Sequence, residues 1–408
     1  MRHRWTRIIG IGVAFALLGA ACNSAPGSSD GGTPTTMPGH DMGAATSATA
    51  ASELRSNLNL LLQEHVYLAA IATNEALAGR TDGFTAAAGV LDANSDDLIE
   101  TFGSVYPDAE ATFSDAWKGH IGFFVDYTTG LAEEDQAKAD KAIADLQGYA
   151  DSFGQFLSDT VEGLPDGEAV SGLILEHALT LKAVVDAQAA GQAGPAFAAL
   201  REAAGHMHML ADPLAAAIAG DNGLEGDANA PAAGLRSDLN RLLQEHVYLA
   251  GIAAEEALAG RQPVFEAAAA ALDGNSDDVI ATFGSVYPDA EATFSDGWKG
   301  HIGFVVDYVT GVATSDQDVM DRAVADLLGY VDSFGQFLSD TIPTLPGGEA
   351  VSGLIEEHVL TLKATIDAVA DADPEVFTKL RTAAGHMHML GDPLTESIVQ
   401  DNPEAFAA

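Results

Sequence analysis

The chain has 408 residues, of which 47% are apolar, enough material for more than one packed core. Its 60 Asp and Glu residues against 18 Lys and Arg residues give a formal net charge of −42. So acidic a chain repels phosphate backbones, which excludes nucleic-acid binding, and it attracts cations. The single cysteine, Cys22, excludes disulfide frameworks, Cys-ligated zinc and iron–sulfur clusters.

The first 21 residues have the features of a secretory signal peptide, because three arginines precede an apolar run at 8–20 and small residues follow it. Cys22 comes directly after Leu-Gly-Ala-Ala, which resembles the cleavage box of bacterial lipoproteins, where the cysteine receives the lipid. We therefore expect an extracytoplasmic protein whose only membrane contact is a lipid anchor at Cys22. Without lipidation it would be secreted. Residues 22–51, rich in Ser, Gly, Pro, Thr and Ala, are expected to form a flexible tether.

The rest of the chain is one unit present twice, with an offset of 181 residues until a single deletion near the end. The repeated stretches include LLQEHVYLA at 61–69 and 242–250, and AAGHMHML at 203–210 and 383–390. We predict one domain at 52–221 and a second at 234–403. The linker between them, 222–233, is rich in Gly, Asn, Asp and Pro.

Both copies are predicted to be helical, since Ala, Leu, Glu, Asp and Gln dominate and apolar residues recur at steps of three and four. Breaks rich in glycine and proline cut the first copy into six helices of roughly 20 to 28 residues, a common length in bundles. These breaks lie at 79–83, 106–107, 130–135, 163–167 and 191–195. The sequence therefore predicts an all-α protein of two tandem six-helix domains. Each resembles a four-helix bundle and is built from three helical hairpins.

All ten histidines beyond residue 40 fall at five equivalent positions in each copy. Several lie on apolar helical stripes; His208, for example, continues the stripe of Phe197 and Leu200, whereas His206 points away from it. Buried imidazoles are costly without partners, so their convergence predicts a transition-metal site in each copy. The candidate metal ligands are His65, His120, His177, His206 and His208, and His246, His301, His358, His386 and His388.

Other polar or soft side chains recur near these histidines. Two aspartates of each copy follow a histidine by 31 residues and are expected to accept its second ring N–H. Glutamates directly before a histidine point about 100° away around a helix, which makes them weaker candidates. Methionine thioethers favour copper, above all Cu(I). These supporting candidates are Asp96, Asp151, Asp277, Asp332, Glu64, Glu176, Glu245, Glu357, Met207, Met209, Met387 and Met389.

Copper is the first choice of metal, followed by zinc and iron, and haem stays open. No glutamate lies three residues before any of these histidines, which disfavours a carboxylate-bridged di-iron site. We expect metal buffering, storage or delivery, and the sequence indicates no protein partner. One alternative is a metal- or haem-dependent redox or oxygen-handling enzyme of hemerythrin or ferritin type. The other is a metal-free structural module at the cell surface.

The stretches LLQEHVYLA (61–69), WKGHIGFFVDY (117–127) and AAGHMHMLADPL (203–214) resemble a group of secreted helical proteins from Gram-positive bacteria, sometimes described as copper amine oxidase-like. The resemblance covers nearly all of both copies. It implies an extracytoplasmic helical protein with a connection to copper. The chain departs from the amine oxidases themselves because it has no Asn-Tyr pair, from which those enzymes build their quinone.

Overall fold

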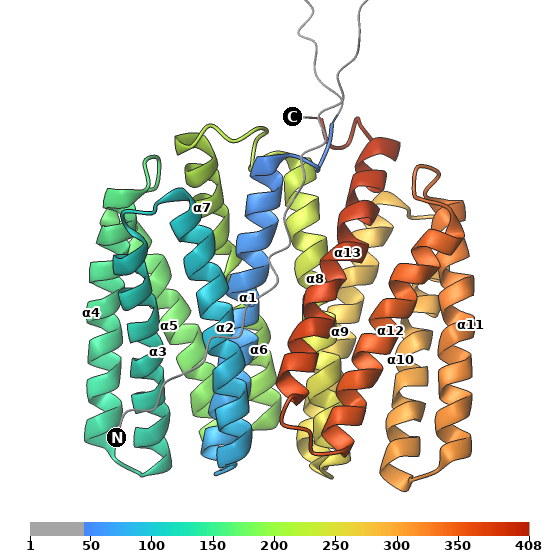
Figure 1. Ribbon diagram of the computed structural model, residues 1–408, viewed down its shortest axis with the longest axis horizontal. Helices are drawn as coiled ribbons and strands as arrows, with labels where there is room; N and C mark the ends of the chain where they lie inside the picture. Colours follow the sequence, from blue (N-terminus) through green and yellow to red (C-terminus); the bar gives the residue numbers. More distant parts are fainter. Residues whose placement is uncertain (1–44, 408) are drawn as a thin grey trace, which may run out of the picture. The chain divides into compact units, whose positions relative to one another are not determined.

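A computed structural model describes residues 45–407, and this part of the chain contains helices and turns but no β-strand. The first copy contains α1 (Ala50–Leu77), α2 (Thr81–Val105), α3 (Glu110–Ala132), α4 (Gln136–Thr160), α5 (Gly167–Ala189), α6 (Ala193–His206) and α7 (His208–Asp221). The second contains α8 (Pro231–Leu258), α9 (Gln262–Val286), α10 (Glu291–Thr314), α11 (Gln317–Thr341), α12 (Gly348–Ala370) and α13 (Val376–Asp401). The predicted all-α fold of two repeated helical bundles is confirmed (Figure 1). The predicted signal peptide, Cys22 and the tether up to residue 44 lie outside the described residues.

The last helix of the first copy is divided at Met207, so that α6 and α7 together correspond to the single helix α13. The backbone of Met207 stays in the right-handed helical region (φ −59°, ψ −26°). Its N–H bonds to the carbonyl of Ala204, three residues back, which is a local 3₁₀-like tightening. Proline is not the cause of the division, because Pro393 in α13 occupies the place of Pro213 in α7 and leaves its helix continuous.

The helices begin and end at residues whose chemistry suits these positions. The side chain of Asp135 caps α4 by accepting from the Lys138 N–H, and Asp166 caps α5 by accepting from the Ala169 N–H. After α1 the chain reverses at Gly79, whose φ of +69° is a left-handed conformation that glycine adopts without strain. The helices are thereby joined by short turns into antiparallel neighbours.

Helix α1 occupies the centre of its bundle and packs against α2, α3, α5, α6 and α7. It also packs against α8 of the second copy, and the two helices run side by side in Figure 1. Every residue from 62 to 73 is buried, so α1 has no solvent-facing side over this stretch. One helix therefore takes part both in the core of its own copy and in the contact between the copies.

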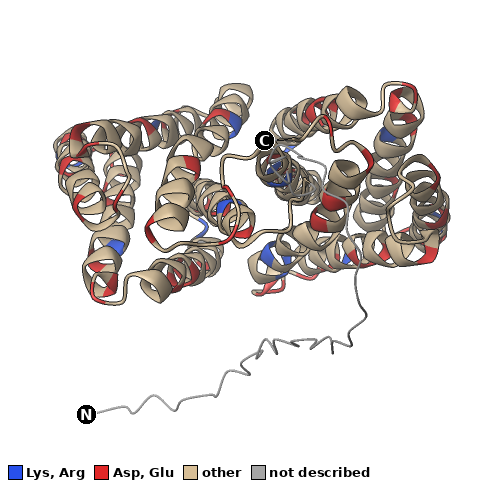
Figure 2. Ribbon diagram, turned by 90° about the horizontal axis from the view of Figure 1, so that it is seen from above, with Lys and Arg blue, Asp and Glu red and all other residues tan. Residues whose placement is uncertain are grey.

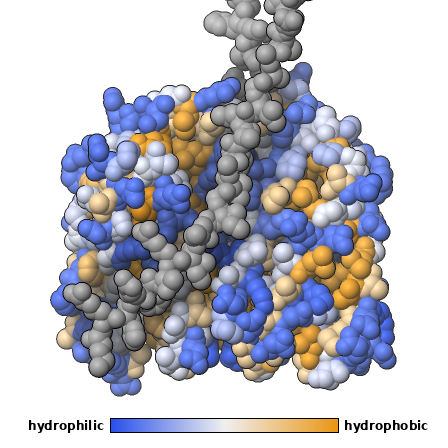
Figure 3. Space-filling view, viewed as in Figure 1, coloured by the Kyte–Doolittle hydropathy of each residue, from blue (hydrophilic) through white to orange (hydrophobic). Residues whose placement is uncertain are grey.

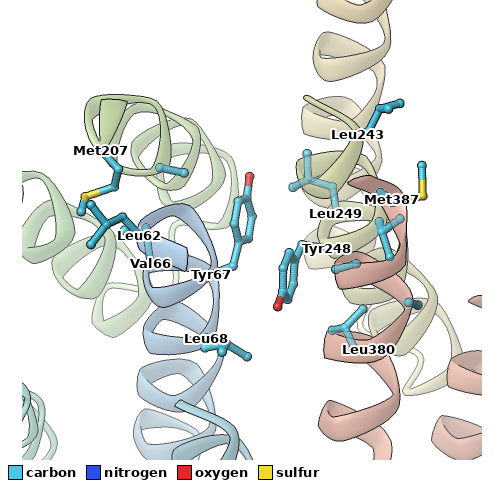
Figure 4. Close-up of a cluster of buried hydrophobic side chains, with 14 of the residues drawn as sticks. Leu62, Val66, Tyr67, Leu68, Met207, Leu243, Tyr248, Leu249, Leu380 and Met387 are labelled. Carbon is cyan, nitrogen blue, oxygen red and sulfur yellow. The ribbon is translucent and has the colours of Figure 1, made fainter. Parts of the chain in front are cut away.

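The two sides of the contact between the copies are related by an approximate two-fold symmetry. Tyr67 of α1 and Tyr248 of α8 are fully buried, and their rings stack with centroids 5.1 Å apart. Figure 4 shows the two rings face to face with the hydroxyl groups pointing in opposite directions. The Tyr67 hydroxyl donates to Glu245 at 2.9 Å, and the Tyr248 hydroxyl donates to Glu64 at 2.9 Å. Such a reciprocal pattern is that of an isologous dimer interface, here within one chain.

Two buried carboxylates of this interface, Glu64 and Glu245, are each paired with several donors. Glu64 also accepts from Asn94 at 2.8 Å and from Arg381 at 2.9 Å. At the equivalent place Glu245 accepts from Asn275 and Arg201, at 2.9 and 3.0 Å. A buried carboxylate is tolerated when hydrogen bonds and a cation satisfy it, and here the cation comes from the opposite copy.

The surface is acidic and carries small apolar patches. Figure 2 shows many more acidic than basic positions along the helices, and the face in Figure 3 is mostly hydrophilic with scattered apolar areas. The exposed large apolar residues include three equivalent pairs, Val125 and Val306, Leu179 and Leu360, and Met209 and Met389. Among the described helices, none has a stretch long and apolar enough to cross a membrane.

The interface predicts that Arg201 and Arg381 stabilise the folded chain. Replacing either by Met leaves a buried glutamate without its cation, and we expect the free energy of unfolding to fall by about 2 kcal/mol per site. Urea denaturation followed by circular dichroism measures this change. Lys141→Met is the control, since Lys141 pairs with Asp145 at the surface and its removal should change stability by less than about 0.5 kcal/mol. Equal effects of the two kinds of substitution would contradict the assignment.

Candidate metal centre

Three histidines from different helices of the first copy meet in its interior. His65 comes from α1, His120 from α3 and His177 from α5, and one ring nitrogen of each lies within 4.8 Å of the others. The ring centroids are separated by 5.4, 5.9 and 6.4 Å. With metal–nitrogen bonds of about 2 Å, two ligand nitrogens on one ion lie roughly 3 to 4 Å apart, so small rotations of the rings suffice to bind one. We call this group the first triad.

The second copy repeats the arrangement with His246 on α8, His301 on α10 and His358 on α12, the second triad. Its centroid separations are 5.3, 5.8 and 6.4 Å, nearly the same as in the first triad. The Nε2 atoms of His246 and His301 approach to 3.3 Å. The same geometry therefore forms twice from two stretches of sequence that are no longer identical.

All six imidazoles are buried; in the first triad their exposed fractions are 1%, 2% and 4%. Burial lowers the pKa of His120 to about 4 and that of His177 to about 3, and His120 and His206 lower the latter further. The pKa of His65 is also lowered, first by burial and then by its two neighbours in the triad. The rings are therefore neutral at pH 7, the form in which imidazole binds a metal.

Several nitrogens of the triads have no hydrogen-bond partner among residues 45–407. They are Nδ1 of His65, His120, His177, His246, His301 and His358, and also Nε2 of His177. Native cores rarely leave buried polar atoms unpaired, because each costs the full loss of its hydration. Three converging, neutral imidazoles have the chemistry of a metal ligand set, and the two triads could each hold one ion.

An aromatic and sulfur-containing wall surrounds the first triad. Trp117 lies against His65 and His120, and Tyr149 stacks on His120 with ring centroids 5.0 Å apart. A cavity of about 60 Å³ is lined by Trp117, His120, His177, Tyr149 and the buried Met207, among apolar residues. Trp117 precedes His120 by three residues, so the i, i+3 spacing could have indicated the contact, although both Trp117 and Trp298 read more simply as core aromatics.

A larger cavity, of about 450 Å³, also touches the first triad. Its wall includes His65 and His120 at one place and Lys118 and the exposed Asp92 at another. The imidazoles are thus buried, but this cavity between the helices extends from them to exposed residues. It is the candidate path by which an ion would reach the first triad.

The structure does not bring the remaining histidines into the triads. His206 and His386 bind backbone carbonyl oxygens, of Leu173 at 3.2 Å and Leu354 at 3.3 Å. His208 and His388 bond through Nδ1 to the carbonyls of Gly205 and Gly385, three residues earlier in the chain; His208 is half-buried and His388 exposed.

The expectation that His208 continues the apolar stripe is wrong, because the buried face of α6 and α7 passes through Met207 instead. Met207 and Met387 are each 1% exposed, whereas Met209 and Met389 are about half exposed. In Figure 4, Met207 lies beside Leu62 and Val66 of α1. The same exchange occurs in the continuous helix α13, where Met387 is buried and His388 exposed, so the division at Met207 is not its cause. Met207 follows the buried Ala203 by four residues and precedes the buried Ala211 by four, so the regular helical step passes through the methionine.

The aspartates expected to orient the imidazoles face solvent. Asp96 accepts from Lys118 at 2.7 Å and Asp277 from Lys299 at 2.8 Å, while Asp151 and Asp332 are exposed. Their predicted hydrogen bonds to the histidine rings are therefore wrong. The 31-residue spacing placed each aspartate on the correct neighbouring helix, but the residue before it takes the inward position: Ser95, Ala150, Ser276 and Val331 are buried.

The glutamates that directly precede the triad histidines in the sequence do not line the triads. Glu64 and Glu245 bind across the contact between the copies, as described above. Glu176 and Glu357 are exposed, although a Glu357 oxygen lies 3.8 Å from Nδ1 of His386. Within the described chain, the surroundings of the triads are thus made of aromatic, aliphatic and sulfur-containing groups rather than carboxylates.

The lowered histidine pKa values predict how acid affects the metal-free protein. An unfolded chain protonates its imidazoles below about pH 6.5, whereas the folded chain keeps those of His120 and His177 neutral down to about 4 and 3. Protons thus favour the unfolded chain, and stability should fall as pH drops from about 6.5 toward 4, by up to about 1.4 kcal/mol per pH unit for each imidazole.

Urea titrations at several pH values, with a chelator present, measure this slope. The double variant His120→Leu/His301→Leu should reduce it, whereas His208→Leu/His388→Leu should leave it nearly as in the unchanged chain. The comparison between variants separates the triads from the many carboxylates, which also respond to pH. A slope that is the same in both double variants would show that the triads are not the source.

Comparison with known proteins adds no assignment: no family model, no curated protein and no solved structure matches this chain. The function is therefore argued from the geometry of the two triads. The three features that any assignment must explain are the neutrality of the imidazoles, their unpaired nitrogens and their occurrence twice.

Proposed function

We propose that the protein binds one transition-metal ion in each triad and serves to buffer, store or deliver that metal. The observation that carries the proposal is the meeting of three neutral, buried imidazoles with unpaired nitrogens, in both copies. A set of three histidines is an established kind of metal site in proteins. A purely structural core would be more stable with leucines at these positions, because the rings gain few hydrogen bonds that offset their burial.

Copper is the metal we favour. Met207 lines the cavity beside His120 and His177 and is itself buried, so a thioether stands close to the imidazoles. Imidazole and thioether together suit copper, above all Cu(I), whereas carboxylates, which suit harder ions, face away from the triads. Zinc is the second choice because three imidazoles also suit it.

Elemental analysis of the purified full-length protein after copper loading tests the proposal. We expect two ions per chain, one in the variants His120→Leu or His301→Leu, and none when both are changed. His208→Leu/His388→Leu is the matched control and should retain two, because these histidines lie outside the triads. Circular dichroism shows whether each variant folds.

Tryptophan fluorescence provides an independent reading. Two of the three tryptophans of the chain, Trp117 and Trp298, each lie against two imidazoles of a triad, so bound copper should quench their emission. Stoichiometric quenching that disappears in the double variant supports the triads as the site. Equal copper content in the unchanged chain and the folded double variant overturns the proposal, and higher stability of that variant would favour a metal-free structural module.

The sequence of residues 1–22 supports an extracytoplasmic location, with the protein held to the membrane by a lipid on Cys22. The acidic body then meets metal ions outside the cytoplasm. We expect Cys22→Ala to move the protein from the membrane fraction to the medium, and the change is measured by fractionation and detergent partitioning. A Ser24→Ala variant serves as control and should stay with the membrane. Retention of Cys22→Ala in the membrane would contradict the anchor.

A further inference from the structure

The indole N–H groups of Trp117 and Trp298 are buried without an acceptor. Trp117 is 6% exposed and Trp298 is 5% exposed. Within the described chain, neither Nε1 atom has a hydrogen-bond partner. An indole nitrogen can only donate, so it cannot be satisfied by another donor. Because buried donors are normally hydrogen-bonded, an unpaired donor at the same place in both copies indicates an acceptor that is not part of the polypeptide.

Both indoles lie at the triads. The Trp117 ring is 4.9 Å from the His65 ring and 4.7 Å from the His120 ring, the second at an edge-to-face angle of 70°. Trp298 repeats these contacts with His246 and His301 at 4.9 and 5.1 Å. In each copy the unpaired donor therefore belongs to a ring that packs against two imidazoles of the triad.

The space beside the first triad is of a suitable size. The cavity lined by Trp117, His120 and His177 has a volume of about 60 Å³, which admits a molecule of a few atoms but no organic substrate. Met207 also lines it, but a thioether is a weak acceptor and does not satisfy an indole N–H. In the second copy a cavity of about 30 Å³ is lined by Trp298, Thr282 and apolar side chains, and no histidine of the second triad lines it.

We propose that each triad binds its metal with three imidazoles and one small external ligand, an anion or hydroxide, which accepts a hydrogen bond from Trp117 or Trp298. The proposal rests on the function proposed above and adds the ligand class of the fourth position. Three protein ligands with an exchangeable fourth are the arrangement of open metal sites, in contrast to closed structural ones. The tryptophan holds the external ligand in place and does not bind the metal itself.

Tyr149 offers the appropriate control, because it lines the same cavity but stacks on only one imidazole of the triad, that of His120. Its equivalent, Tyr330, stacks on His301 at 5.0 Å. Replacing these tyrosines by Phe removes a hydroxyl from beside the triads and keeps the ring, just as Trp→Phe removes the indole N–H and keeps an aromatic side chain.

Azide is the probe, since it is small, anionic and gives a charge-transfer absorption when it binds copper(II). The full-length protein is loaded with copper(II), the copper content is measured, and azide is titrated per bound copper. We expect a saturable absorption band in the unchanged chain. In Trp117→Phe/Trp298→Phe the azide affinity should fall about tenfold, the loss of one charge-assisted hydrogen bond, whereas Tyr149→Phe/Tyr330→Phe should bind azide within about twofold of the unchanged chain.

The outcomes separate the two proposals. A chain that binds no copper overturns the metal-binding function and the fourth ligand with it. Bound copper without an azide band shows a closed site and overturns only the further inference. A loss of affinity in the tyrosine variant with none in the tryptophan variant assigns the hydrogen bond to tyrosine, which also overturns it. If Trp→Phe lowers the copper content, affinities still refer to bound copper, and an unchanged value counts against the indole.

Discussion

The meeting of three imidazoles in a buried interior is the constraint on which this structure depends. Polar rings are expensive to bury, and these make few hydrogen bonds that offset the cost. Because each ring comes from a different helix, α1, α3 and α5 must be held at fixed distances for the group to exist. The bundle thus keeps the imidazoles neutral and together in advance, which reduces what a bound ion has to reorganise.

Helix α1 connects this site with the contact between the copies. His65 points into its own bundle. Glu64 instead accepts from Tyr248 and Arg381 of the opposite copy, and Tyr67 donates to Glu245 there. Adjacent residues on a helix point about 100° apart, so one helix can supply both places. The symmetric interface fixes the positions of α1 and α8, and each of these helices carries one histidine of a triad. The two triads therefore lie on either side of one buried contact between the copies.

The chemistry near the triads separates this protein from the di-iron bundles that a helical, histidine-containing sequence first suggests. Those sites rely on bridging carboxylates, whereas here Asp96 pairs with a lysine and Glu64 with an arginine. What surrounds the imidazoles is Trp117, Tyr149 and Met207. These surroundings are the reason why we propose a soft metal ion, copper, in place of a carboxylate-bridged iron pair.

The sequence by itself determined the helical class, the approximate helix ends and the inward direction of His65, His120 and His177, because helical periodicity fixes which residues share a face. It did not determine which of two adjacent residues faces inward, because Met207 and His208 both lie at helical steps from buried residues, and Met207 occupies the core. Nor could it show that Glu64 binds Tyr248, 184 positions away, and takes no part in the triad of the adjacent His65. Only the packing of helices decided these contacts, since a one-residue step turns a side chain by about 100° and long-range partners leave no local pattern.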